Sequence, residues 1–254
     1  MQALSLLQFV PTFVLVFFRL AGMMLFAPLF GSTRIPRRVR ALLVLILAPG
    51  VTPGVPPAVL PGDTWHLATA IGGEMAFGLA MGMALGLVFV AAQWAGEMIG
   101  QQMGLNLGAV FDPQFGSSSI VGEMYFMLTL VIFLVIDGHH AMLHGVRDSF
   151  EQLPLLSVGI DRGVFDTVIG LLGGATVLAI RLAAPMLVTM LIVDLVLGLV
   201  GKTMPQMNVM SAGLTLRSVV GMVIVIIGLS MTSGVIREAV TSAMLQARAG
   251  WAGR

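Results

Sequence analysis

Residues 65–100 read WHLATAIGGEMAFGLAMGMALGLVFVAAQWAGEMIG, an apolar run with glycine at regular intervals. Gly78, Gly82 and Gly86 recur at every fourth position. Residues four apart lie on one helix face, so these glycines predict a smooth stripe against which a second helix packs closely. The same spacing returns at Gly96 and Gly100. Such a stripe serves either packing within the chain or a seam between subunits, and the sequence leaves both open.

This run is also too long for a simple membrane span. A helix over residues 65–100 would extend about 54 Å, whereas the hydrocarbon core of a bilayer is about 30 Å thick. We expect helices that either break and fold back or project beyond the bilayer and bury apolar surface on other subunits. Further apolar runs cover residues 6–30, 41–60, 120–136, 167–200 and 207–245.

The composition places the chain among membrane proteins. Of its 254 residues, 57% are hydrophobic and 10% are charged, against about 25% charged in soluble domains, and the mean hydropathy is +1.00. A net charge of +1 argues against nucleic acid as a partner, since phosphate binding needs a basic stripe. The chain has no cysteine, which excludes disulfides, thiolate catalysis and cysteine-based metal sites.

Two regions bear on the helices and their topology. The prolines between residues 49 and 61 limit the second apolar run to an expected short helix over residues 41–48. The first basic residue, Arg19, lies inside the first apolar run, so we do not expect a cleaved signal peptide. The positive-inside rule places the densest basic cluster on the cytoplasmic side. This cluster comprises Arg34, Arg37, Arg38 and Arg40.

Charged residues inside apolar runs are costly and need partners. We predict salt bridges or intersubunit contacts for them, with a proton or ion relay as an alternative. The set comprises Arg19, Glu74, Glu97, Glu123, Arg181, Asp194 and Arg217, with Lys202 at the edge of its run.

The segment 101–119, QQMGLNLGAVFDPQFGSSS, interrupts two apolar runs and contains apolar residues that solvent-facing loops usually avoid. Irregular backbone at membrane depth is tolerated where it is buried in protein or lines a cavity. A glycine-hinged apolar loop of this kind would suit a closure that blocks ions yet moves aside. The predicted closure residues are Gly104, Leu105, Asn106, Leu107, Gly108, Ala109, Val110, Phe111, Asp112 and Pro113.

No motif predicts an enzyme. Asp137, His140, His144 and Asp148 would share a helix face and could ligate zinc, but Gly138 weakens a helix there and we assign no metal. The chain has no HExxH, no Gly-x-Ser-x-Gly elbow and no phosphate-binding glycine loop. We therefore expect no catalytic residues and no cofactor.

Residues 95–105, AGEMIGQQMGL, followed by Phe111-Asp112-Pro113, resemble the FliR family of flagellar biosynthetic proteins. Flanking segments agree with this family along nearly the whole chain: IPRRVR at 35–40, DGH at 137–139, SFEQLP at 149–154, LGL at 197–199 and PQMN at 205–208. The family often has Asn where Asp137 stands, and the tail after Leu245 is short.

This resemblance implies an all-α, single-domain subunit (residues 1–254) whose membrane-type helical hairpins and long kinked helices pack into a hetero-oligomeric type III export gate. The implied partners are several copies of FliP-like and FliQ-like subunits, an FlhB-like subunit and unfolded exported flagellar proteins. The implied location is the bacterial inner membrane at the flagellar basal body, and the loop at about residues 104–119 would be the plug of the closed channel.

Three alternatives stay open. The nearest is the homologous T-type subunit of a virulence injectisome. A secondary transporter could also use broken helices and buried carboxylates, although it should show internal repeat symmetry. An intramembrane enzyme would need a nucleophile or metal motif.

Overall fold

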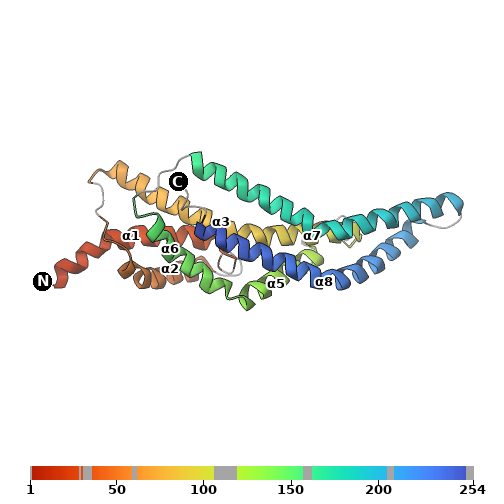
Figure 1. The fold of residues 1–254 in the computed structure, drawn as a ribbon, viewed down its shortest axis with the longest axis horizontal. Coiled ribbons are helices and arrows are strands. Elements are labelled where there is room, and N and C mark those ends of the chain that lie inside the picture. Colours follow the sequence, from red (N-terminus) through yellow and green to blue (C-terminus); the bar gives the residue numbers. More distant parts are fainter. Residues whose placement is uncertain are drawn as a thin grey trace. The chain divides into compact units, whose positions relative to one another are not determined.

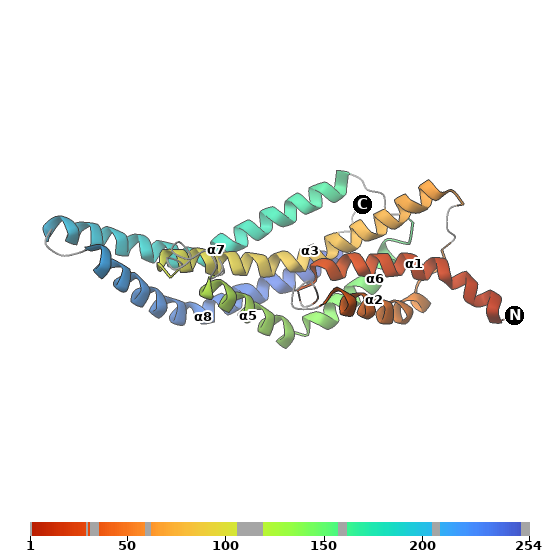
Figure 2. The same cartoon turned by 180° about the vertical axis from the view of Figure 1, so that it is seen from behind.

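The computed structural model describes residues 2–28, 30, 36–58, 62–105, 119–156, 162–204 and 209–249. In this part of the chain every regular element is a helix and there is no strand (Figures 1 and 2). The prediction of an all-α, membrane-type protein is confirmed. The elements are α1 (Gln2–Phe26), α2 (Arg37–Val51), the 3-10 turn η1 (Thr52–Gly54), α3 (Thr64–Gln102), α5 (Ile120–Val135), α6 (Gly138–Gln152), α7 (Arg162–Thr203) and α8 (Val209–Ala249).

Four of these helices are long and apolar enough to cross a membrane, namely α1, α3, α7 and α8. The pair α5 and α6 passes the same test only when taken together, and it is bent by 67° at the break. The apolar run of α3 is one unbroken helix of 39 residues, and α7 and α8 have 42 and 41 residues. The overlong apolar runs therefore form continuous helices and do not break and fold back.

The expected helix over residues 41–48 is too short. Helix α2 begins at Arg37, because Pro36 has the extended backbone (φ −56°, ψ 140°) of a residue that precedes a helix. It also continues through Pro49 to Val51. Proline removes one backbone donor, and so close to the helix end this cost is limited. There, Thr52 donates its hydroxyl to the Ala48 carbonyl at 2.7 Å.

Helix α6 was not expected as a separate element. Its composition is mixed, and Gly138 and Gly145 reduce helix propensity. The break before it is made by Asp137, which adopts left-handed backbone (φ 54°, ψ 34°). The apolar helix α5 thus ends abruptly, and a helix with a polar face follows.

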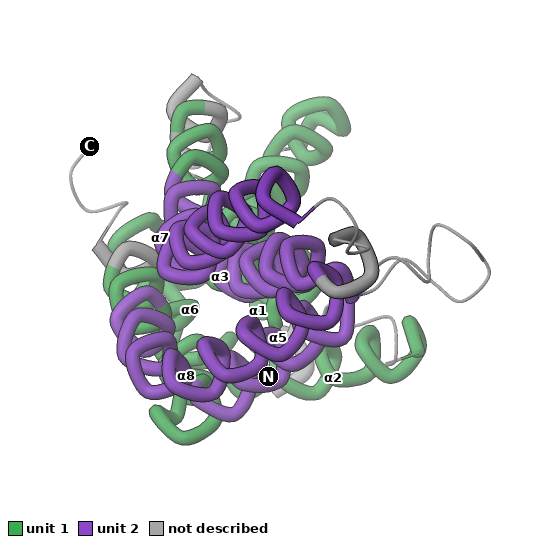
Figure 3. The backbone as a smooth tube through the Cα atoms, turned by 90° about the vertical axis from the view of Figure 1, so that its right-hand side faces the viewer, with its two compact units in different colours: residues 1–87, 133–173, 240–254 green, residues 88–132, 174–239 purple. Residues whose placement is uncertain are grey.

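The chain divides into two compact units, coloured separately in Figure 3. Unit 1 contains residues 1–87, 133–173 and 240–254, and unit 2 contains residues 88–132 and 174–239. Each unit is assembled from segments far apart in the sequence. The core of unit 1 includes Leu15, Leu20, Met24 and Phe77, while unit 2 buries Phe89, Ile99 and Met190.

Candidate functional site

The glycine stripe of α3 contacts the backbone of α1 in unit 1. A Cβ atom at Gly78 would collide with the carbonyl oxygen of Arg19, and one at Gly82 would collide with the carbonyl oxygen of Met23. A Cβ at Gly86 would lie 2.5 Å from the carbonyl oxygen of Phe26. Residue numbers rise together along both helices, so α1 and α3 run parallel. We call this contact the α1–α3 seam; it is a contact within the chain.

One turn before the seam glycines, on the same α3 face, lies Glu74. Arg19 donates from Nε to Glu74 Oε2 at 2.6 Å, and the two side chains are 0% and 1% exposed. The close approach of the backbones at Gly78 brings these two charges within reach of each other. A buried ion pair is costly unless its remaining donors and acceptors are satisfied.

The remaining polar atoms of this pair do have partners. The guanidinium donates from Nη1 to the carbonyl and hydroxyl oxygens of Ser149, at 3.3 and 3.2 Å. Both Nη atoms donate to the Leu153 carbonyl, at 3.3 and 3.2 Å. Glu74 Oε1 accepts from the backbone N–H of Leu156 at 3.1 Å. The pair therefore ties α1 and α3 to the last turn of α6 and the residues that follow it.

Two aromatic rings complete this environment. The guanidinium carbon of Arg19 lies 4.7 Å from the ring centroid of Phe77 and 4.3 Å from that of Phe150. Both distances are within the range of a cation–π interaction. We call the group Arg19, Glu74, Phe77, Ser149 and Phe150 the arginine cluster. The Arg19 guanidinium is removed from water, and each of its nitrogen atoms has a hydrogen-bond acceptor.

Unit 2 contains an ion pair of a different kind, between the antiparallel helices α7 and α8. Arg217 Nη2 lies 2.6 Å from Asp194 Oδ1, and the side chains remain 39% and 38% exposed. Further along the same two helices, Arg181 and Glu238 approach to 3.9 Å while exposed. Both views show these parts of α7 and α8 side by side (Figures 1 and 2).

The other predicted intramembrane charges are not buried. Glu97 is half-buried and accepts a hydrogen bond from Gln93 at 3.2 Å. Glu123 is half-buried, and Lys202 is exposed. The predicted set of charges thus divides into one fully buried pair, the half-exposed Arg217–Asp194 pair and more accessible residues.

The second glycine set lies in unit 2. A Cβ at Gly96 would lie 2.6 Å from the carbonyl oxygen of Val121 and 2.7 Å from the Cα of Gly122. Helices α3 and α5 therefore touch backbone to backbone here, and the edge-to-face pair Phe89–Phe126 continues the contact. Gly100 is buried near the end of α3.

Helix α3 ends in a Schellman motif that includes Gly104 and Leu105, the first two residues of the predicted plug. Gly104 has left-handed backbone (φ 74°), which glycine adopts without steric cost. Its N–H donates to Gln101 O at 3.0 Å, and the N–H of Leu105 donates to Gly100 O at 3.1 Å. These are the two hydrogen bonds that define the motif. Gly104, predicted as a hinge, is the residue that stops the helix.

The end of α3 is also attached to α8. Ser218 donates its hydroxyl to the Met103 carbonyl at 3.0 Å. The buried side chains of Met103, Met186 and Met190 crowd against Gly221, where a Cβ would lie within 2.9 Å of each. Leu105, the next predicted closure residue, is 43% exposed. The remaining closure residues, 106–113, lie outside the described part of the chain.

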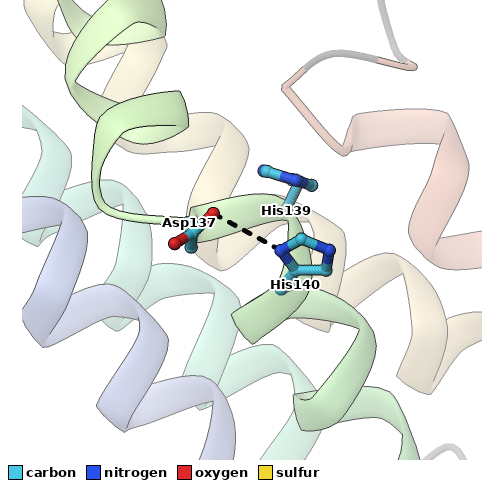
Figure 4. A group of neighbouring side chains, drawn as sticks. All are labelled: Asp137, His139 and His140. Carbon is cyan, nitrogen blue, oxygen red and sulfur yellow. Dashed lines mark ion pairs between the residues drawn. The ribbon is translucent and has the colours of Figure 1, made fainter.

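Of the four predicted zinc-ligand candidates, two gather with a residue not predicted (Figure 4). Ligand atoms of Asp137, His139 and His140 lie within 4.8 Å of one another. The two imidazole rings stack, however, with centroids 4.1 Å apart and planes inclined by 38°. Imidazoles bind a metal through in-plane nitrogen lone pairs, which stacked rings do not direct at one point. Asp137 instead interacts with His140 at 3.4 Å, and we assign no metal here.

Within the described part of the chain, the arrangement provides anchoring and close packing between helices. The profile described as "Bacterial export proteins, family 1" matches residues 10–243. The chain belongs to this family.

The names of individual relatives indicate which kind of export apparatus the family members belong to. The chain is 29% identical to the flagellar biosynthetic protein FliR of Bacillus subtilis, covering 92% of both chains, and 29% identical to that of Aquifex aeolicus, covering 88% of this chain and 87% of the relative. It is also 26% identical to the surface presentation of antigens protein SpaR of Shigella flexneri, covering 84% and 82%. The chain is an integral-membrane subunit of a type III export apparatus of the flagellar kind.

Several residues of the described sites were not predicted. Ser149 and Phe150 in the arginine cluster lie in the SFEQLP segment, which was noted only as a family feature. Phe77 was read as part of an apolar run. Ser218 follows a predicted charge, Arg217, but nothing in the sequence indicates that it faces the end of α3.

Proposed function

We propose that this chain is a structural, non-enzymatic core subunit of the flagellar export gate, assembled with FliP-like, FliQ-like and FlhB-like proteins. As one domain over residues 1–254 it would help to form a gated channel for unfolded flagellar proteins in the inner membrane. The family match over residues 10–243 is the observation that carries this proposal.

Helices α7 and α8 support the assembly part of the proposal. In their membrane-length windows only 17% of the residues are buried within the chain. Their exposed residues include Ile180, Leu191, Leu195, Ile226 and Ile227. Each of these helices is about 60 Å long, which is twice the thickness of the hydrocarbon layer. Lipid alone could therefore cover only about half of the exposed apolar surface. Neighbouring subunits would cover the part that lipid cannot.

Co-expression with the FliP-like and FliQ-like proteins of the same organism tests the assembly. Native mass spectrometry of the detergent-purified material should show a stable complex with a single copy of this chain. A chain that purifies alone as a folded monomer or homodimer, ignoring both partners, would contradict the proposal.

We propose further that residues 104–119 close the channel. The Schellman end of α3 and the Ser218 contact supply a fixed base from which such a loop could swing, a gating role. Replacing residues 104–119 with a short flexible linker should leave the complex assembled but make the membrane permeable to small ions. A matched linker replacing the connection at residues 205–208 should not. An assembled complex with no added ion leak would remove the plug assignment.

The match to a SpaR protein makes the injectisome subunit the second candidate. Complementation separates the two, because each apparatus has its own partners. Expression in a flagellar fliR deletion strain should restore motility if the flagellar assignment is right. Restoration of injectisome secretion without motility would favour the second candidate.

A further inference from the structure

Helix α6 carries an uninterrupted polar face. His140, His144, Arg147 and Glu151 are spaced four, three and four residues apart, so they share one side of the helix. All four are exposed. In a chain with only 10% charged residues, a four-residue polar stripe along one helix is exceptional and needs a physical reason.

The orientation of this stripe is determined by the opposite face of α6. Met142, Val146 and Phe150 are buried there. The Phe150 ring lies against the Arg19 guanidinium, and Ser149 accepts two of its hydrogen bonds. Rotating α6 to hide the polar stripe would break these contacts with a buried charge. The stripe therefore points away from the arginine cluster and from the rest of unit 1.

We propose that the polar face of α6 borders an aqueous compartment, and that α5 and α6 do not together form a single membrane span. In this arrangement α5 occupies the apolar layer, and the chain leaves that layer at the 67° break. Helix α6 then runs with its stripe in water and its apolar face against the other helices of unit 1. This topology goes beyond the export function and does not depend on it.

The two helices differ as this arrangement requires. The exposed side chains of α5 are apolar, with Val131 and Val135 57% and 76% exposed. Across the break, Asp137 and His140 are 75% and 64% exposed at the start of α6. Arg147 and Glu151 are exposed on this stripe, so as parts of a span they would place charged groups in hydrocarbon, which proteins avoid.

Single cysteines can test the inference, because the chain has none of its own. His144→Cys on the stripe and Val131→Cys on α5 would each be placed in the full-length protein in its native membrane. A charged, membrane-impermeant maleimide would be applied to intact spheroplasts and to inverted vesicles. Thiols react as thiolates, which form in water and not in lipid.

We expect His144→Cys to react from one of the two sides at least tenfold faster than Val131→Cys. Arg147→Cys, on the same stripe, should react from the same side and replaces His144→Cys if that variant does not accumulate. Two results would overturn the inference: no reaction from either side while the denatured protein reacts fully, or equal reaction at Val131→Cys and the stripe. A stripe covered by a partner protein would give the first of these results.

Discussion

The Arg19–Glu74 pair of unit 1 and the Arg217–Asp194 pair of unit 2 have the same nitrogen–oxygen distance, 2.6 Å. They differ in their surroundings. The first pair is 0% and 1% exposed, and neighbouring carbonyls, a hydroxyl and two rings complete its contacts. The second is 39% and 38% exposed on the surface of a two-helix hairpin. Distance alone therefore says little about how much each pair contributes to the fold.

Removing one charge from each pair should give the largest contrast. Glu74→Ala leaves Arg19 buried without its counter-charge, so we expect the unfolding free energy to fall by about 3–5 kcal/mol. Asp194→Ala should lower it by less than about 1 kcal/mol. Denaturant titration of the detergent-solubilised protein measures both. Equal effects would mean that burial does not distinguish the two pairs.

A substitution in the α1–α3 seam can disrupt the buried Arg19–Glu74 pair by pushing the two helix backbones apart. Gly78→Ala forces a methyl group against the Arg19 carbonyl and separates the helices that hold the two charges. Overpacking of this kind typically costs about 1–3 kcal/mol.

Gly174→Ala on α7 is the matched control, because nothing lies within 4 Å of a Cβ at that position. Alanine is the better helix former by up to about 1 kcal/mol, so this variant should be neutral or more stable in thermal melts. A Gly78→Ala protein as stable as the Gly174→Ala protein would refute the seam as a tight backbone contact.

Removing the Ser149 hydroxyl, which also donates to the Val146 carbonyl at 2.6 Å, should have a smaller effect. Ser149→Ala deletes the hydroxyl that accepts from Arg19 Nη1 at 3.2 Å but leaves the carbonyl acceptors in place. We expect a loss of about 1 kcal/mol in unfolding free energy. Ser218→Ala removes a half-buried hydroxyl in unit 2 as a comparison. A Ser149→Ala effect as large as that of Glu74→Ala would show that the hydroxyl, and not the carboxylate, compensates the charge.

Exchanging the two charges of the exposed pair should have the smallest effect. The double variant with Asp194→Arg and Arg217→Asp retains opposite charges at both positions, so its stability should lie within about 0.5 kcal/mol of the original. Each single reversal should cost more at low salt than at 1 M salt, where exposed charges are screened. A double variant that unfolds as readily as the single reversals would indicate that the pair depends on its specific geometry.

Much of the fold follows from the long apolar runs of the sequence. The apolar runs predicted α3, α7 and α8 closely, because long apolar helices leave a signal that needs no tertiary information. Helix α6 escaped prediction because its polar stripe and glycines dilute that signal, and because the contacts of Ser149 and Phe150 with Arg19 join residues far apart in the sequence. The predicted helix ended at residue 48, before Pro49, whereas α2 continues to Val51. The prediction overestimated how strongly a proline disrupts the last turn of a helix.

The charge pairs show where sequence reasoning stops. The charges inside apolar runs could be identified, and their need for partners follows from electrostatics. Which residue pairs with Arg19 depends on how α1 and α3 align, 55 residues apart in sequence. One signal was available: Glu74 continues the four-residue spacing of the seam glycines, so it shares the face that meets α1. The residues predicted to close the channel beyond Leu105 lie outside the described structure and stay a prediction.

The parallel course of α1 and α3 bears on how the chain is made. Ribosomes add about 5–20 residues per second, so the 55 residues between Arg19 and Glu74 separate their synthesis by about 3–11 s. Ser149 follows Arg19 by 130 residues, which corresponds to about 7–26 s at the same rate. During the first interval the nascent first helix carries a positive charge whose partner Glu74 has not yet been made, so the site that accommodates Arg19 is completed only late in synthesis.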